Sequence, residues 1–207
     1  MIGIFGGTFD PIHYGHLRAA VEVSESLGLS ELRLIPSATP PHRKQPAASA
    51  AMRVEMLQLA LQNQPQLHID LRELNRPGAS YMVDTLKSLR LDYPDTALLL
   101  FIGTDAFNQL HQWHQWQQLF DYAHIVVMTR PSYQAQPLAA FFAERLARLA
   151  IELAEHHAGK LYFQPITQLD ISATAIRNLI AQRQNPGFLL PDTVIAYIRQ
   201  HQLYQGD

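Results

Sequence analysis

The stretch GGTFDPIHYGH, residues 6–16, decides how this chain begins to fold. It follows an apolar run at residues 2–5, which predicts a buried strand, and it precedes a segment whose apolar residues have helical spacing. A glycine-rich turn between a strand and a helix points backbone N–H groups at a bound anion. His13 and His16, three residues apart at the start of that helix, would face the same anion. The stretch therefore predicts a phosphate site in a protein that handles a nucleotide.

The better-known glycine-rich nucleotide motifs do not fit this stretch. Neither the Walker pattern GxxxxGK[ST] nor the dinucleotide fingerprint GxGxxG occurs in it. A pair of histidines can simply cap a helix, but its position after a strand and a Gly-Gly turn favours the phosphate interpretation.

Strands and helices are expected to alternate along the whole chain. Short apolar segments predict strands at residues 2–5, 32–35, 97–102, 125–128 and 161–166, and the alternation of apolar and polar residues predicts a strand at 68–74. Helices are expected over residues 17–27, ended by Gly28, after caps at Ser49 and Ser80, and over residues 138–156, 173–183 and 192–202. This alternation predicts an α/β fold: a doubly wound, Rossmann-like parallel sheet with helices on both faces and a small C-terminal helical segment. No repeat or linker interrupts it, so residues 1–207 are expected to form one domain.

Composition narrows the class of protein. The net charge of −2 favours neither nucleic acid nor an anionic membrane as a partner. The absence of cysteine excludes disulfides, thiolate metal sites and a cysteine nucleophile, and it fits a reducing cytosol. No apolar run approaches the ~20 residues that span a bilayer, and no signal peptide is visible. A cytoplasmic location is therefore expected.

A second stretch, ISATAIR at residues 171–177, stands near the other end of the chain. Together the two stretches resemble the nucleotidylyltransferase superfamily, whose hallmarks are GGxF[DN]PxHxGH and, further on, ISxTxIR. Within it the chain is similar to the bacterial nicotinate-nucleotide adenylyltransferases, and this similarity covers residues 2–204. The supporting segments are Ile35-Pro36, Pro40-Pro41-His42-Arg43, residues 80–86, Gly103-Thr104-Asp105, Trp113 and Arg130-Pro131.

The resemblance implies a reaction between two nucleotides. The 5′-phosphate of nicotinate mononucleotide attacks the α-phosphorus of ATP, and pyrophosphate leaves. The second pKa of a phosphate monoester is about 6, so this nucleophile is already ionised at pH 7. Such an enzyme needs no general base; it needs two aligned polyanions and stabilisation of the charge that grows on the α-phosphate.

The resemblance also implies which residues carry this chemistry. His13, His16 and Arg177 are expected to be catalytic, with His16 stabilising the transition state and Arg177 reaching the leaving phosphates. Ser172 is expected to cap a helix, so that its hydroxyl and the following amides face the anion. Asp105 would contact the ribose or help to place a metal ion. The expected ATP-binding residues are Gly6, Gly7, Thr8, Phe9, Gly103, Asp105, Ser172 and Thr174.

The nicotinate ring needs an aromatic platform and donors for its carboxylate. Trp113 aligns with the ring-stacking tryptophan of the family, and Trp116 is a competitor that could equally pack in the core. Met82 stands where the family usually has threonine, so a carboxylate contact there must come from backbone amides. The expected substrate-binding residues are Pro41, His42, Arg43, Tyr81, Met82, Trp113 and Arg130. The basic loop at residues 42–44 could close over the mononucleotide or be a solvated charged tip.

The remaining basic residues have weaker assignments. Arg53 is expected near the same face, where it could serve phosphates. The histidines expected at the surface or at helix ends, without any metal-site pattern, are His111, His114, His124, His156, His157 and His201. Mg²⁺ is implied as a cofactor that binds mainly through the ATP phosphates, without an all-protein cage.

Several alternatives stay open at this point. Transfer to nicotinamide mononucleotide or to phosphopantetheine within the same superfamily is the runner-up activity. A regulator without catalysis would be expected to carry a damaged motif, and both motifs are intact. A class I aminoacyl-tRNA synthetase would be larger and more basic. The expected partners are ATP and nicotinate mononucleotide, with no nucleic acid or membrane, and the chain could be a monomer or a homo-oligomer.

Overall fold

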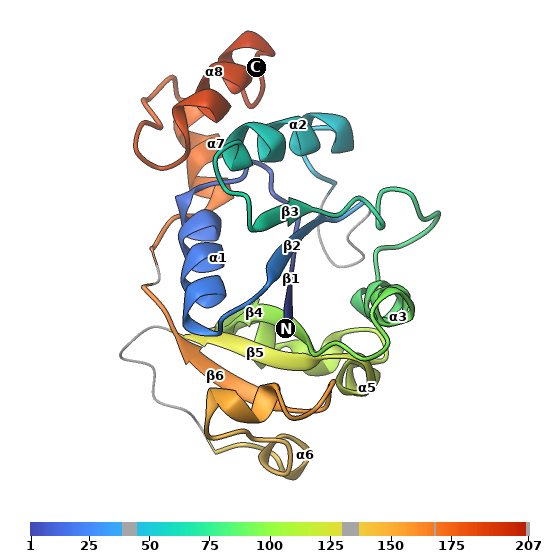
Figure 1. The fold of residues 1–207 in the computed structure, drawn as a ribbon. Helices are drawn as coiled ribbons and strands as arrows, with labels where there is room; N and C mark the ends of the chain where they lie inside the picture. Colours follow the sequence, from blue (N-terminus) through green and yellow to red (C-terminus); the bar gives the residue numbers. More distant parts are fainter. Residues whose placement is uncertain (39–44, 130–136, 168, 206–207) are drawn as a thin grey trace.

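The computed structural model describes residues 1–38, 45–129, 137–167 and 169–205. Its centre is a six-stranded sheet with parallel neighbours in the order β3-β2-β1-β4-β5-β6 (Figure 1). The strands are β1 (Ile2–Gly7), β2 (Glu31–Pro36), β3 (Leu67–Ile69), β4 (Leu98–Gly103), β5 (His124–Thr129) and β6 (Leu161–Pro165). The doubly wound, Rossmann-like sheet expected from the sequence is confirmed.

Helices cover both faces of the sheet (Figure 1). The α-helices are α1 (Tyr14–Ser26), α2 (Ala50–Leu61), α3 (Met82–Asp92), α4 (Thr104–Asn108), α5 (Leu119–Tyr122), α6 (Ala140–Ala143), α7 (Ala173–Ala181) and α8 (Asp192–Gln200). Shorter 3-10 turns are η1 (Leu110–Gln112), η2 (Trp116–Gln118) and η3 (Ala150–Leu153). In β4, Leu99 and Phe101 join the core under α1, α2 and α8, whereas Leu98 and Leu100 join the core under α3 and α5. This alternation is why β4 reads as a continuous apolar run.

The order in which the chain adds strands to the sheet reverses between β1 and β4. β1 pairs with β2 from Ile2 to Gly7, but its pairing with β4 ends at Ile4 opposite Leu100. The two strands therefore part before the Gly-Gly turn. In open α/β sheets, ligands bind beyond the carboxyl ends of the strands at such a switch point.

Three helix boundaries predicted from capping residues are confirmed. The Ser49 hydroxyl accepts a hydrogen bond from Met52 N at the start of α2, and Ser172 accepts one from Ala175 N at the start of α7. Gly28 lies two residues after the end of α1 with a φ of +59°, a conformation that glycine adopts without steric cost.

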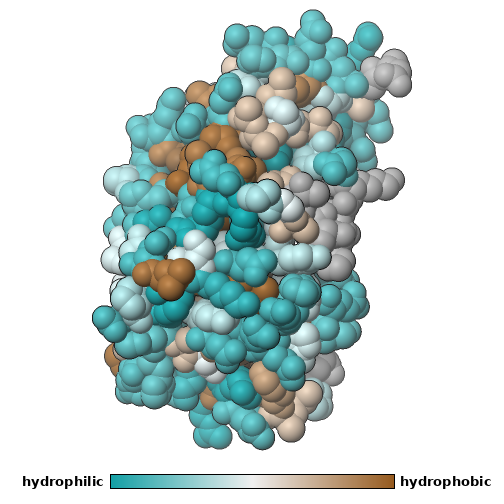
Figure 2. All heavy atoms as spheres, turned by 90° about the vertical axis from the view of Figure 1, so that its right-hand side faces the viewer, coloured by the Kyte–Doolittle hydropathy of each residue, from teal (hydrophilic) through white to brown (hydrophobic). Residues whose placement is uncertain are grey.

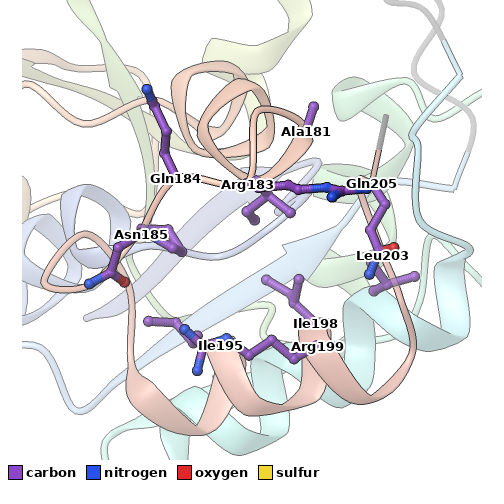
Figure 3. Close-up of a pocket in the computed structure, with 11 residues that line it drawn as sticks. Ala181, Arg183, Gln184, Asn185, Ile195, Ile198, Arg199, Leu203 and Gln205 are labelled. Carbon is purple, nitrogen blue, oxygen red and sulfur yellow. The ribbon is translucent and has the colours of Figure 1, made fainter. Parts of the chain in front are cut away.

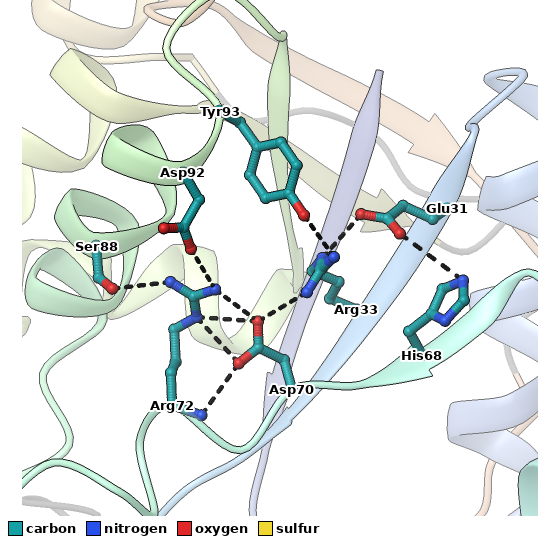
Figure 4. A network of polar contacts seen from close by, with 8 residues as sticks. All are labelled: Glu31, Arg33, His68, Asp70, Arg72, Ser88, Asp92 and Tyr93. Carbon is teal, nitrogen blue, oxygen red and sulfur yellow. Dashed lines mark hydrogen bonds and ion pairs between the residues drawn. The ribbon is translucent and has the colours of Figure 1, made fainter.

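The strand expected at residues 68–74 is wrong beyond Ile69. The carboxylate of Asp70, which is 7% exposed, accepts hydrogen bonds from Arg33 Nη1 at 3.2 Å and from Arg72 Nε at 2.9 and 3.0 Å. Arg72 also reaches Asp92 at the end of α3, as Figure 4 shows. Burial favours a raised pKa of Asp70, but the two guanidiniums outweigh it and hold that pKa below its usual value. This network stabilises a turn where the sequence pattern predicted a longer strand.

The expected helix cap at Ser80 is also wrong. The N-cap of α3 is Tyr81, and the Ser80 hydroxyl instead accepts a hydrogen bond from Ala38 N at 2.9 Å. Ser80 thus connects the start of α3 to the loop after β2.

The long helix expected over residues 138–156 is replaced by α6, an extended stretch and η3. In that stretch Leu146 forms a parallel bridge with Leu161, the first residue of β6. Leu161 N donates to Arg145 O, and Ala147 N donates to Leu161 O, each at 2.8 Å. Pairing with the sheet edge therefore takes the backbone groups that a continuous helix would have used.

The C-terminal helices pack on the beginning of the chain. Tyr14 N, at the start of α1, donates to Leu189 O at 2.9 Å, and α8 lies against α2. In Figure 1, α7 and α8 stand together with α2 at one end of the sheet. Figure 2 shows the surface on the side of α3. Hydrophilic residues, in teal, cover most of it, and the hydrophobic residues, in brown, form a few separate groups. Among the described helices, none has the length and apolarity needed to cross a bilayer.

Candidate functional site

A cavity of about 400 Å³ opens beyond the carboxyl ends of β1 and β4. Its lining includes seven residues that the sequence analysis assigned to substrates: Gly6, Gly7, Thr8, Tyr81, Met82, Asp105 and Trp113. It also includes Ser37, Glu73, Ser80, Ala106, Gln109 and His114. The volume lies within the range of roughly 300–1,000 Å³ that small-molecule sites occupy. The switch point between β1 and β4 is therefore a formed cavity.

Close packing explains both glycines of the turn. A Cβ on Gly6 would lie 2.6 Å from Met82 Cε, and a Cβ on Gly7 would lie 2.8 Å from the Phe9 ring. Phe9 has a φ of +50° and is 1% exposed, so its side chain packs under the turn and does not line the cavity. At Gly6 and Gly7 the turn therefore offers a ligand only its backbone.

The two histidines of the first stretch lie against each other at the start of α1. Their ring centroids are 3.8 Å apart, with 29° between the ring planes. His13 is 5% exposed, and burial lowers its pKa to about 4. Its Nδ1 atom has no hydrogen-bond partner among the described residues. Without a bound anion, His13 is therefore neutral at pH 7, and in this form it can serve an anion as a hydrogen-bond donor.

The two motif stretches meet in the structure. A Cβ on Gly15 would lie 3.3 Å from Ile171 O, so the absence of a side chain lets the backbone before α7 approach α1. Arg177 Nη1 donates to Asp10 O at 2.7 Å, and its Nη2 donates to Thr174 Oγ1 at 3.2 Å. The Arg177 side chain keeps 30% of its surface exposed. Residues 167 positions apart thus share one hydrogen bond beside the glycine turn.

Arg53 has a different place from the one expected. It is 1% exposed, and its Nη1 and Nη2 atoms donate to Thr8 O at 2.7 Å and to Ser37 O at 2.8 Å. Both carbonyls belong to loops that line the cavity. Arg53 therefore holds these two loops together, and the expectation that it serves phosphates directly is wrong because its side chain is buried and does not line the cavity.

Aromatic residues form the other end of the cavity. The Tyr81 ring lies 4.3 Å from the His114 ring, centroid to centroid, and Trp113 lines the cavity beside them. Trp116 instead packs against Phe141 and Phe142, with centroids 4.9 and 5.3 Å away. Of the two tryptophans, Trp113 is the one available to a ligand, and Trp116 is a packing residue.

Glu73 is a cavity residue that the sequence analysis missed. It is 3% exposed, and its Oε1 accepts a hydrogen bond from Thr85 Oγ1 at 2.7 Å. Burial raises its pKa, against the opposing effect of hydrogen bonds from Thr85 and Ser80 and of the nearby Arg76 guanidinium. The sequence signal for Glu73 was a carboxylate near the end of an expected strand.

Two histidine assignments are corrected. His124 lies in β5 and is fully buried; its Nε2 lies 2.9 Å from His156 O, and its Nδ1 accepts from Lys160 N at 3.0 Å. It therefore connects the loop between η3 and β6 to β5. His114 is exposed at the surface, as expected, but it also stacks on Tyr81 in the cavity. Its position directly after Trp113 was the signal for this.

The rest of the expected residues lie at the edge of the site or outside the described residues. Gly103 is the N-cap of α4, and a Cβ on it would meet nothing within 4 Å. Asp105, exposed in the first turn of α4, lines the cavity, while the hydroxyls of Ser172 and Thr174 remain at the exposed start of α7. The remaining predicted substrate residues, Pro41, His42, Arg43 and Arg130, lie outside the described residues.

A second cavity, of about 440 Å³, lies between the end of α7 and α8 (Figure 3). Ile195, Ile198 and Leu203 give it an apolar wall, and Arg183 and Arg199 line it as well. It shares no lining residue with the first cavity. None of its residues was expected to be functional.

Comparisons with known proteins agree with this geometry. The family described as cytidylyltransferase-like matches residues 4–179. A protein of Methylococcus capsulatus named "probable nicotinate-nucleotide adenylyltransferase" is 47% identical, over 99% of both chains. A protein of the same name from Aeromonas salmonicida is 44% identical, over 100% of this chain and 98% of its own. Among solved structures, Plasmodium falciparum nicotinic acid mononucleotide adenylyltransferase complexed with NaAD superposes with a TM-score of 0.74 at 18% identity, covering 98% and 96% of the two chains.

Proposed function

Because the chain belongs to the nicotinate-nucleotide adenylyltransferase family, we propose that it transfers the adenylyl group of ATP to nicotinate mononucleotide. The products are nicotinate adenine dinucleotide and pyrophosphate. The observation that carries the proposal is the hydrogen bond from Arg177 to Asp10 O, which joins the two motif stretches. The first of these stretches lines the cavity through Gly6, Gly7 and Thr8, whereas His13, His16 and Arg177 are not among its lining residues.

The catalytic contribution of the protein is alignment and charge stabilisation. The mononucleotide phosphate is ionised at pH 7 and attacks the α-phosphorus without a general base. His16 and neutral His13 would donate hydrogen bonds to the α- and β-phosphate oxygens, where negative charge grows. Arg177, with 30% of its side chain exposed, would reach the departing pyrophosphate while Asp10 O holds one of its nitrogens.

The aromatic end of the cavity suits the nicotinate ring. Trp113 can stack on the ring, and the Tyr81–His114 pair offers a second aromatic surface. Met82, at the first position of α3, has no hydroxyl for the carboxylate, so the amides at the N-terminus of α3 would receive it.

Magnesium fits this site as a partner of the phosphates. No group of three or more potential protein ligands occurs among the described residues, and Asp105 is an exposed carboxylate in the cavity lining. Mg²⁺ typically keeps several waters and binds through one or two carboxylates and the substrate phosphates. When bound, it would offset part of the triphosphate charge.

The cytoplasmic location expected from the sequence stays a prediction.

A substrate panel tests the proposal. The enzyme is incubated with ATP and one of nicotinate mononucleotide, nicotinamide mononucleotide or phosphopantetheine, and pyrophosphate is measured. We expect the highest kcat/KM for nicotinate mononucleotide and no pyrophosphate from ATP alone. Equal or higher kcat/KM for the amide, or activity only with phosphopantetheine, would assign the transfer to another acceptor.

A further inference from the structure

The carboxylate of Asp10 joins three segments that are far apart in the sequence. Its Oδ2 accepts a hydrogen bond from Ala47 N at 2.8 Å, and its Oδ1 accepts one from Ala48 N at 3.1 Å. The same Oδ1 accepts a hydrogen bond from Tyr204 Oη at 2.7 Å. Asp10 is 4% exposed, so these donors compete little with water.

Asp10 also lies in the turn at residues 6–13, which leads from β1 into α1 and to which we assign the phosphates; we call it the phosphate turn. Its backbone carbonyl holds Arg177 Nη1, and the stacked histidines begin three residues later. A shift of Asp10 would therefore move a cation and two imidazoles that face the phosphates. Small displacements of such groups reduce turnover strongly, because catalysis here depends on alignment.

The turn that presents Tyr204 is held in an unusual conformation. Gln202 and Tyr204 have φ values of +52° and +63°, in the left-handed region that side chains other than glycine rarely adopt. Leu203 N donates to Ile198 O at 3.0 Å and fastens the turn to the end of α8. Backbone strain of this kind persists where the surrounding contacts fix it. In this turn, the surrounding contact is the hydrogen bond from the Tyr204 hydroxyl to the Asp10 carboxylate.

The Tyr204 hydroxyl remains a donor at any pH at which the enzyme would work. Its burial and its bond to Asp10 raise the pKa of Tyr204 well above the usual value. The hydrogen bond is therefore directional and persistent, with the phenol donating and the carboxylate accepting.

We propose that Tyr204 is a positioning residue for adenylyl transfer: its hydroxyl fixes the Asp10 carboxylate and thereby sets the places of Arg177, His13 and His16. The inference rests on the proposed function. It assigns a role in turnover to the C-terminal turn, whose residues 202–205 do not line the cavity at the switch point.

The chain supplies a matched control in Tyr197. Tyr197 lies on α8 and, like Tyr204, interacts through its hydroxyl with a carboxylate, that of Glu55 on α2. Burial and this interaction raise the pKa of Tyr197 to about 12. Y197F and Y204F therefore remove the same atom from the same C-terminal region, but only Tyr204 contacts the phosphate turn.

The test compares kcat and KM of the wild type, Y204F and Y197F well below their unfolding temperatures. The number of ATP molecules bound per chain, measured by calorimetry, gives the concentration of folded sites to which kcat is normalised. We expect Y204F to lower kcat about tenfold per folded site, which is less than the ~10²-fold that a displacement of about 1 Å can cost. KM should change less than twofold. Y197F should keep kcat within twofold of the wild type. In NMR spectra, Y204F but not Y197F should shift the His13 and His16 imidazole resonances.

A double-mutant cycle with D10N adds a second measurement. The effects of Y204F and D10N on kcat should be strongly non-additive because both act on one hydrogen bond, whereas Y197F and D10N should be additive. Wild-type kcat in the Y204F enzyme, or an equal loss in Y197F, overturns the inference while leaving the proposed function intact. An inactive wild type in the substrate panel would instead overturn the proposed function.

Discussion

The imidazoles of His13 and His16 stack with their centroids 3.8 Å apart, at the point where the glycine turn enters α1. His13 is the buried member of the pair, and His16 is partly exposed and packs edge-on against Phe9, with centroids 5.2 Å apart. The pair therefore gives the two histidines different tasks. Under the proposed function, His13 would be a neutral, fixed hydrogen-bond donor, and His16 would donate to the phosphate oxygens on which charge develops.

Replacing His16 with alanine should lower kcat by about 10²-fold, the usual effect of removing one preorganised donor to a developing charge. KM for ATP should change much less, because the donor acts mainly on the transition state. Pyrophosphate release under saturating substrates measures the change. The exposed His111 supplies the control, since H111A should retain wild-type turnover. Wild-type turnover in H16A would remove His16 from the mechanism.

The buried His13 should make the protein less stable in acid. Its pKa is about 4 in the folded state and near 6.5 when unfolded, so between these pH values the unfolded state binds more protons. This contribution is complete above pH 6.5 and is lost as the pH falls towards 4. Between pH 6.5 and 5 the loss is about 2 kcal/mol. Urea unfolding should show that H13Q lacks this part of the pH dependence, whereas H111Q retains it; an unchanged slope in H13Q contradicts the assignment.

Arg53 should contribute to stability and not only to the site. In R53M the carbonyls of Thr8 and Ser37 lose buried donors, which should lower the free energy of unfolding by about 3 kcal/mol. The control is R18M, because the exposed Arg18–Glu22 pair on α1 should be worth less than about 1 kcal/mol. Chemical denaturation of both variants gives the comparison. A loss in R53M no larger than that in R18M would show that the two loops do not depend on Arg53.

Replacing Trp113 should mainly weaken mononucleotide binding, and replacing Trp116 should mainly lower the free energy of unfolding. W113A should raise KM for the mononucleotide about tenfold, in line with the ~1.5 kcal/mol of an aromatic stack, and it should also lose some stability because Trp113 packs partly against the core. W116A should lower the free energy of unfolding by about 2 kcal/mol through its lost contacts with Phe141 and Phe142, and should affect KM little. Steady-state kinetics and thermal unfolding are measured on both. The reverse pattern would exchange the roles assigned to Trp113 and Trp116.

Much of the fold could be predicted because local signals and tertiary contacts agree. β1 and β4 are apolar throughout, and Ser49 and Ser172 begin helices as their side chains suggest. The cavity lining at the glycine turn also followed from the position of that motif between a strand and a helix, and the lining at Trp113 followed from the resemblance to the family.

The errors arose where long-range contacts override a local pattern. Asp70 ends its strand because Arg33 and Arg72 bind its carboxylate, and neither partner is evident from the alternation of residues 68–74. The helix expected at residues 138–156 is interrupted by the pairing of Leu146 with the sheet edge. The places of Glu73 and Arg53 became evident only through their three-dimensional partners, since a buried charge looks like a surface charge in the sequence.

The most direct test is a crystal structure with a non-hydrolysable ATP analogue. We expect phosphate oxygens within hydrogen-bond distance of the His16 ring and of the Gly7–Thr8 backbone, with Arg177 and the Ser172 hydroxyl closing on the terminal phosphates. A triphosphate bound elsewhere, for example against Arg183 and Arg199 in the cavity between α7 and α8, would contradict the proposed phosphate site.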